Sequence, residues 1–146
     1  KKGFSVAVHS RTKDKAAALL AEGAGWADSP AELARETDFL CVAVDDGAAV
    51  RAVLLDRDGA IETLPPHAIT IDFSTIAPRD ARSIGAAFAE RSRAFIDAPV
   101  SGGDVGAREA RLTIMAGGSP EGFETARPVF DAVGRSAVRF GPTGAG

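Results

Sequence analysis

The 146-residue sequence has few of the residues that build disulfides or metal centres. It has one cysteine, Cys41, so no disulfide can form within a single chain. Its two histidines, His9 and His67, have no further metal ligands at a suitable spacing. Cys41 lies in the apolar run of residues 39–44, where we expect a small buried hydrophobic side chain. Disulfide scaffolds and metalloenzymes are therefore excluded.

Long apolar stretches and a basic surface are also absent. No run approaches the ~20 apolar residues of a membrane span, and we expect no signal peptide. The net charge of -3 argues against a nucleic-acid partner, because holding a phosphate backbone requires a large basic surface. With 45% hydrophobic and 25% charged residues, the sequence is typical of one globular domain. We expect a cytoplasmic protein.

Motifs of two common enzyme classes are missing as well. The nucleophile elbow of serine hydrolases needs glycine two residues before the serine, where Ser101 has Pro99. No phosphate loop ending in Gly-Lys-Ser/Thr occurs. Hydrolase and nucleotide triphosphatase readings are therefore rejected.

Strand and helix patterns alternate along the chain. Ser29, Pro30 and Glu32 predict a capped helix start, and Ser119 with Pro120 predicts another. We expect strands over residues 4–9, 39–44, 68–73, 94–97, 112–116 and 137–140, and helices over residues 13–22, 29–36, 48–55, 78–91 and 120–133. The continuously apolar residues 39–44 indicate a parallel strand buried on both faces. This order predicts an α/β fold with a mostly parallel sheet covered on both faces, and ligand sites at the carboxyl ends of the strands.

Basic residues gather near the first of these strand ends. Arg11 lies in the loop after the strand, where an NAD-specific fold usually has an acidic residue, so a basic residue suits the 2′-phosphate of NADP. Lysines nearby in the sequence add to the local positive charge: Lys1, Lys2, Lys13 and Lys15. For Lys13 and Lys15, a solvated helix start explains the residues equally well.

The later loops hold further candidates. Ser74 and Thr75 follow a strand and precede a helix, so their hydroxyls either bind a cofactor or, as is commoner, cap the helix. Asp45 and Asp46 are expected to face solvent, and by themselves they indicate no chemistry. Ser101-Gly102-Gly103 offers one hydroxyl and two unencumbered backbone N–H groups, which can hold a small carboxylate. A tight turn alone would explain only the glycines.

Three blocks of the sequence resemble the β-hydroxyacid dehydrogenase family, which includes 3-hydroxyisobutyrate dehydrogenase, tartronate semialdehyde reductase and, more distantly, 6-phosphogluconate dehydrogenase. The likeness covers essentially the whole chain. The blocks are Asp97-Ala98-Pro99-Val100-Ser101-Gly102-Gly103, Leu112-Thr113-Ile114-Met115-Ala116-Gly117-Gly118 and Ile71-Asp72-Phe73-Ser74-Thr75-Ile76-Ala77-Pro78. The resemblance implies a Rossmann-like, doubly wound domain that binds NADP, with NAD as the alternative, and a small substrate that bears a carboxylate.

The resemblance also implies roles for single residues. Ser101, Gly102 and Gly103 would hold the substrate carboxylate, and Thr75 would contact the nicotinamide half of the cofactor. The remaining implied cofactor contacts are Arg11 and Thr12 beside the adenosine ribose, with Val44 and Asp45 flanking the cofactor. Two departures bear on cofactor affinity. Ser10 stands where the family usually has asparagine, and Ala43-Val44 stands where it usually has Leu-Pro.

Parts of the family pattern are missing from these 146 residues. The first strand and its glycine-rich phosphate loop would precede Lys1, and the catalytic lysine and the helical dimerisation domain would follow Gly146. We therefore expect residues 1–146 to form a partial dinucleotide-binding domain without a catalytic residue of its own. Loss of the first, central strand should leave an apolar seam open. The isolated piece should be unstable and inactive, and the full-length protein a homo-oligomer.

Three functions are consistent with the sequence. The leading one is hydride transfer between NADP(H) and a small β-hydroxyacid or its semialdehyde. A second is a non-catalytic NADP-binding sensor or scaffold, because fold alone does not determine function. A third is a structural fragment without activity. A lysine within about a dozen residues after Gly146 would favour the enzyme, and saturable NADPH binding would exclude the inert fragment.

Overall fold

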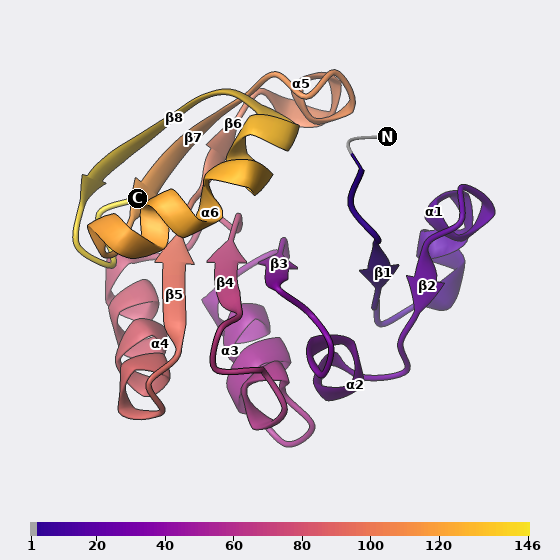
Figure 1. Cartoon of the computed structure of the whole chain (residues 1–146), viewed down its shortest axis with the longest axis horizontal. Coiled ribbons are helices and arrows are strands. Elements are labelled where there is room, and N and C mark those ends of the chain that lie inside the picture. Colours follow the sequence, from indigo (N-terminus) through magenta and orange to yellow (C-terminus); the bar gives the residue numbers. More distant parts are fainter. Residues whose placement is uncertain (1–2) are drawn as a thin grey trace.

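The computed structural model describes residues 3–146, so Lys1 and Lys2 lie outside the described residues. Strands and helices alternate along most of the chain (Figure 1). In chain order the elements are β1 (Ala7–Val8), the 3-10 helix η1 (Lys13–Ala16), α1 (Ala17–Ala21), β2 (Gly25–Trp26), α2 (Pro30–Ala34), β3 (Phe39–Val42), α3 (Gly47–Leu55), the 3-10 helix η2 (Ala60–Glu62), β4 (Ile69–Asp72), α4 (Pro78–Glu90), β5 (Ala94–Asp97), β6 (Val100–Ser101), α5 (Gly103–Arg108), β7 (Leu112–Gly117), α6 (Pro120–Val133) and β8 (Gly134–Gly141).

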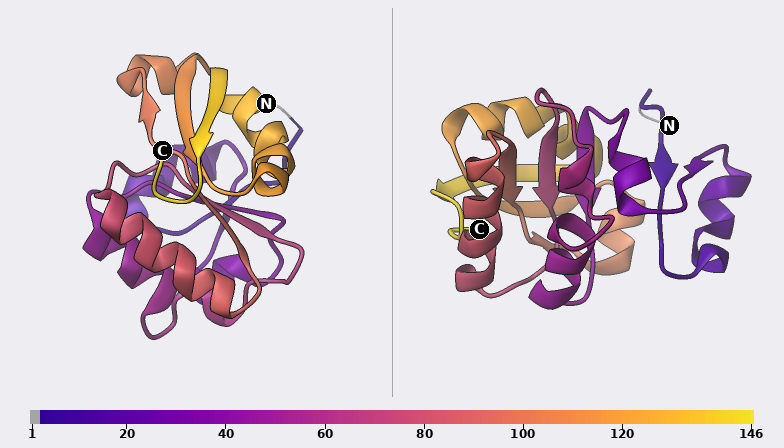
Figure 2. Two further views of the ribbon diagram at one scale, coloured as in Figure 1. Left: turned by 90° about the vertical axis from the view of Figure 1, so that its left-hand side faces the viewer. Right: turned by 90° about the horizontal axis from the view of Figure 1, so that it is seen from below.

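The strands form a small and a large sheet. In the small sheet β1 pairs with β2, whereas the large sheet has the order β3-β4-β5-β7-β6, with β8 on β7. The pairs β1/β2, β3/β4, β4/β5 and β7/β8 are parallel, and β7 runs antiparallel to β5 and β6. Helices α3 and α4 cover one face of the large sheet and α6 covers the other (Figures 1 and 2). The predicted α/β fold with a mostly parallel sheet is therefore confirmed.

Apolar side chains on the two faces of the large sheet form two cores. On the α3–α4 face, Leu54 and Phe88 pack with Leu40 of β3. On the α6 face, Ile71 of β4 packs with Phe130 of α6. All four residues of β4 are buried, which agrees with a central strand covered on both sides.

The prediction that residues 39–44 form a strand buried on both faces is wrong for one face of β3, the face that carries Phe39 and Cys41. Leu40 and Val42 are buried, but Cys41 is exposed and Phe39 is only partly buried. The cause is position, because β3 is the edge strand of the large sheet. Cys41 is therefore not the buried hydrophobic residue that was expected.

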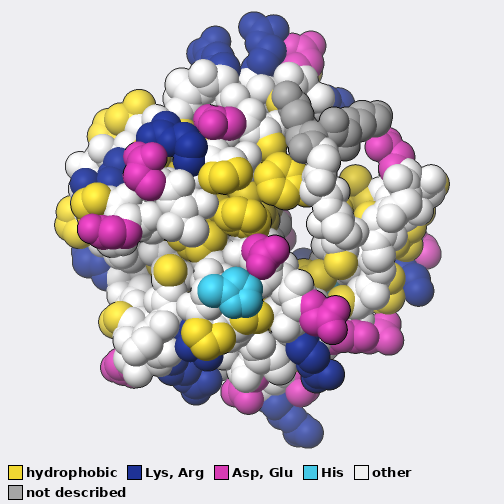
Figure 3. Space-filling view, viewed as in Figure 1, with side chains coloured by type: hydrophobic (Ala, Val, Ile, Leu, Met, Phe, Trp, Pro, Cys, Tyr) yellow, Lys and Arg dark blue, Asp and Glu magenta, His cyan; other side chains and the backbone are white. Residues whose placement is uncertain are grey.

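The N-terminal region is less regular than the sequence pattern predicted. The strand expected over residues 4–9 is reduced to β1, and the helix expected over residues 13–22 divides into η1 and the short α1. Among residues 3–146, the small sheet has no backbone pairing with the large one. Phe4 and Val6 are exposed beside this seam, and the Phe4 ring meets Phe39 edge-on at 6.0 Å. Figure 3 shows a hollow, bordered by hydrophobic side chains, between the N-terminal part and the rest of that face.

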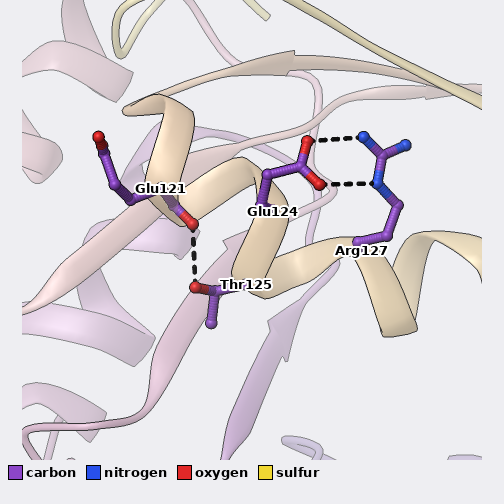
Figure 4. Close-up of polar contacts among 4 residues, drawn as sticks. All are labelled: Glu121, Glu124, Thr125 and Arg127. Carbon is purple, nitrogen blue, oxygen red and sulfur yellow. Dashed lines mark hydrogen bonds and ion pairs between the residues drawn. The ribbon is translucent and has the colours of Figure 1, made fainter.

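The C-terminal part contains one predicted and one unexpected helix. Helix α6 has the predicted bounds, and the Ser119 hydroxyl accepts the Gly122 N–H at 2.9 Å as its N-cap. On its surface, Arg127 forms two hydrogen bonds with Glu124, which lower the pKa of that carboxyl (Figure 4). Helix α5, which begins at Gly103, was not predicted, because glycine is a poor helix former.

Candidate functional site

All five candidate cofactor residues lie in loops after parallel strands. Arg11 and Thr12 follow β1, Val44 and Asp45 follow β3, and Thr75 follows β4. The Arg11 guanidinium lies 3.7 Å from an Asp45 carboxylate oxygen, so the loops after β1 and β3 meet. Both side chains are almost fully exposed, which makes this ion pair weak and easy to rearrange.

Ser74 ties two of these loops together. The Val44 N–H donates to the Ser74 hydroxyl at 3.0 Å, and the Ser74 N–H donates to Asp72 Oδ1 at 2.9 Å. Ser74 is buried, whereas Thr75 beside it is exposed. The expectation that these hydroxyls cap the next helix is wrong, because the N-cap of α4 is Ala77 and it has no side-chain cap.

A small cavity lies along β3, near the cofactor candidates. It has a volume of about 100 Å³, and its lining includes His9, Cys41 and Val44. The His9 imidazole is hydrogen-bonded to the Ala27 carbonyl at 3.0 Å, so it has a structural partner. Cys41 is exposed on one side, but desolvation by the atoms crowded around it raises the pKa of its thiol to about 11.

The serine–glycine seat, which we define as Ser101, Gly102 and Gly103, lies where β6 passes into α5. Gly102 and Gly103 have φ angles of +141° and +61°, which L-residues with side chains rarely adopt. A Cβ on Gly102 would also approach Leu112 Cδ2 to 3.1 Å. The first N–H groups of a helix have no partner within it, so this turn offers donors beside the exposed Ser101.

Ser101 and Gly102 of the seat line a second cavity of about 250 Å³. Its polar lining residues are Ser101, Thr113, Glu109, Arg111 and Arg135. Arg111 donates to Glu109 at 2.9 Å. None of the cofactor candidates lines this cavity. The structure therefore brings Arg11 close to Asp45 and Val44 close to Ser74, whereas the seat lies at a separate cavity.

Two buried acids, which the sequence patterns did not single out as site residues, are the last residues of β4 and β5. Asp72 and Asp97 are register partners on β4 and β5 and are 0% and 3% exposed. Burial and the charge of Asp97 raise the pKa of Asp72, against the lowering effect of its hydrogen bonds with Ser74. Polar residues inside otherwise apolar strands were the available signal.

Residues 3–146 contain neither a candidate metal centre nor a candidate membrane span. No group of three or more histidine, cysteine or acidic side chains in this range could hold a metal ion. No helix in the same range is long and apolar enough to cross a membrane.

The parallel sheet and its strand-end loops define a Rossmann-like α/β domain. A comparison with protein families agrees. Residues 1–141 match the NAD binding domain of 6-phosphogluconate dehydrogenase, and the chain belongs to this family.

Individual relatives are similar over the whole chain but are about twice as long. The NAD-dependent L-serine dehydrogenase of Pseudomonas aeruginosa is 39% identical over 146 residues, which are 100% of this chain and 49% of that protein. A solved structure of Mycobacterium tuberculosis 3-hydroxyisobutyrate dehydrogenase with L-serine has a TM-score of 0.93 and 31% identity, over 99% of this chain and 48% of that one. The Salmonella typhimurium 3-hydroxyisobutyrate dehydrogenase structure has a TM-score of 0.92 and 39% identity, over 99% of this chain and 51% of that one.

Proposed function

We propose that this chain is the cofactor-binding part of an NADP-dependent oxidoreductase that transfers a hydride between NADP(H) and a small β-hydroxyacid or its semialdehyde. The serine–glycine seat carries the proposal, because two positive-φ glycines beside a serine at a strand end provide donors for a carboxylate. The names of the similar dehydrogenases support the same substrate class. The catalytic lysine that the family resemblance implies would lie outside these residues.

The proposed cofactor is NADP, with Arg11 and Thr12 beside the adenosine ribose, Val44 and Asp45 along the cofactor, and Thr75 at the nicotinamide half. The Arg11 guanidinium fits a phosphate, since its ion pair with Asp45 is long and solvent-exposed. A similar solved structure, 33% identical, is described as Psf3 in complex with NADP⁺ and 2-OPP. The P. aeruginosa relative is named NAD-dependent, so cofactor choice needs a direct test.

The test compares NADPH and NADH binding to the full-length protein and to its Arg11→Ala variant. Loss of one charge-assisted phosphate contact should weaken NADPH binding by about 10-fold or more and leave NADH binding within about 2-fold. Arg57→Ala is a matched control, because Arg57 is also exposed and faces an aspartate, Asp58, at 3.9 Å. Equal losses for both cofactors in Arg11→Ala would refute the assignment of Arg11 to the 2′-phosphate.

Turnover separates the enzyme from a binding module. The full-length protein should reduce NADP⁺ in the presence of 3-hydroxyisobutyrate or L-serine, and Ser101→Ala should raise the KM for the acid. Tight NADPH binding without turnover on a panel of small β-hydroxyacids would instead support a sensor or scaffold. We further propose that residues 1–146 alone are inactive and that the full-length protein is a homo-oligomer; steady-state assays and sedimentation measurements test these two points.

A further inference from the structure

The buried acids Asp72 and Asp97 have no ion-pair partner among the described residues, although they lie side by side on β4 and β5. A buried carboxylate without a cation is costly, unless backbone N–H groups compensate for the lost water. The hydrogen bonds of Asp97 therefore indicate which segment of the chain its carboxylate fixes.

Asp97 holds the turn that follows β8. The Gly144 N–H donates to Asp97 Oδ1 at 2.7 Å, and the Gly146 N–H donates to Oδ2 at 2.9 Å. A Cβ on Gly117 of β7 would come within 2.8 Å of both carboxylate oxygens. The turn and β7 thus approach Asp97 at distances that side chains would not allow.

The same turn is packed on its other side by α4. A Cβ on Gly85 of α4 would approach Thr143 Cγ2 to 2.6 Å, so the helix and the turn are in close contact. Because the turn is fixed by α4 and β7, a group bound to it is fixed as well. Asp97, at the end of β5, is hydrogen-bonded to this turn. The seat begins at Ser101, four residues further along the chain.

We propose that Asp97 is a positioning residue for the serine–glycine seat: its carboxylate fastens the end of β5 to the Gly144–Gly146 turn, and this contact sets where Ser101, Gly102 and Gly103 lie. The consequence for catalysis rests on the proposed function, whereas the positioning itself does not. Displacement of a binding group by about 1 Å can cost about 100-fold in rate, so a loosened seat should be visible in kinetics.

Asp97→Asn in the full-length protein is the direct test. Asparagine has the same size, but its NH2 group faces a backbone N–H whichever way the amide is turned, so one hydrogen bond is lost. At temperatures where the variant is folded, we expect the KM for 3-hydroxyisobutyrate to rise by about 10-fold, with NADPH affinity within about 2-fold. Amide exchange should become faster at Gly144 and Gly146 and also at Gly102 and Gly103.

Asp38→Asn is the matched control, since Asp38 is exposed and lies before β3, at the opposite end of the strands. It should change neither readout. If Asp97→Asn does not fold, Gly146→Ala disturbs the same contact, because the new Cβ would lie 2.6 Å from Asp97 Oδ2.

Two results would overturn the proposal. One is a lower unfolding temperature with unchanged KM. The other is faster exchange at Gly144 and Gly146 with unchanged exchange at Gly102 and Gly103. A wild-type protein that oxidises no β-hydroxyacid would refute the proposed function, but the exchange comparison at the seat would still decide the role of Asp97.

Discussion

Asp72→Asn should change how the stability of the protein depends on pH. The Asp72 side chain is fully buried, and its Oδ2 has no hydrogen-bond partner. Burial, and to a smaller extent the charge of Asp97, raise the pKa of Asp72 in the folded protein. The folded state therefore binds this proton more tightly than the unfolded state, whose aspartates titrate near ~3.9.

The stabilisation from the bound proton is complete below the unfolded value and is lost as the pH rises towards the raised pKa of Asp72. One proton changes the free energy of unfolding by at most about 1.4 kcal/mol per pH unit within that window. An asparagine at position 72 carries no titrating proton, so the variant should lack this slope.

Urea unfolding of the full-length wild type and Asp72→Asn at several pH values between 4 and 8 measures the difference. The variant should gain stability relative to the wild type as the pH rises, and then level off. Asp56→Asn, which alters an exposed aspartate, should run parallel to the wild type. Parallel curves for Asp72→Asn and wild type would refute the reasoning.

Three further measurements test other parts of the structure. Gly103→Ala and its matched control Gly23→Ala both force alanine into a positive φ without a steric neighbour. Each should lower the free energy of unfolding in urea by about 1–2 kcal/mol, but only Gly103→Ala should raise the KM for the acid. Cys41 should react with iodoacetamide at pH 7.5 about 100-fold more slowly than an ordinary thiol, because a pKa of about 11 lies two units above the usual 9.0; labelling at the rate of a free thiol would contradict this. Ser119→Ala removes the cap of α6 and should lower the free energy of unfolding by about 1 kcal/mol, and an unchanged denaturation midpoint would show that the cap is dispensable.

Local patterns predicted those elements whose ends carry their own signals. Helix α6 runs from Pro120 to Val133 as expected, because Ser119, Pro120 and Gly134 mark its ends in the sequence. The approach of Arg11 to Asp45 is different, because it joins the loops after β1 and β3, which belong to separate sheets, and no local pattern contains it.

Features that depend on tertiary neighbours were missed. An apolar run does not state whether its strand is central or at an edge, so the exposure of Cys41 was not predictable from residues 39–44. The bond from the Val44 N–H to Ser74 joins residues 30 positions apart, and no local pattern contains it. The reversal of β7 against β5 is hidden for the same reason, because side-chain alternation carries no strand direction. The roles assigned to the serine–glycine seat and to all five cofactor candidates stay predictions; these candidates are Arg11, Thr12, Val44, Asp45 and Thr75.

For residues 3–146 taken alone, without the first strand that the family resemblance implies, the break between the two sheets has a thermodynamic consequence for cofactor binding. Because β1 and β2 share no backbone ladder with β3, residues 3–28 are expected to open and close as a cooperative unit of low local stability. Arg11 belongs to that unit and Asp45 to the large sheet, so a dinucleotide that contacts both residues binds only the closed arrangement. Its apparent affinity is then the intrinsic affinity reduced by the closed fraction, and any contact that closes the seam tightens binding without touching the cofactor.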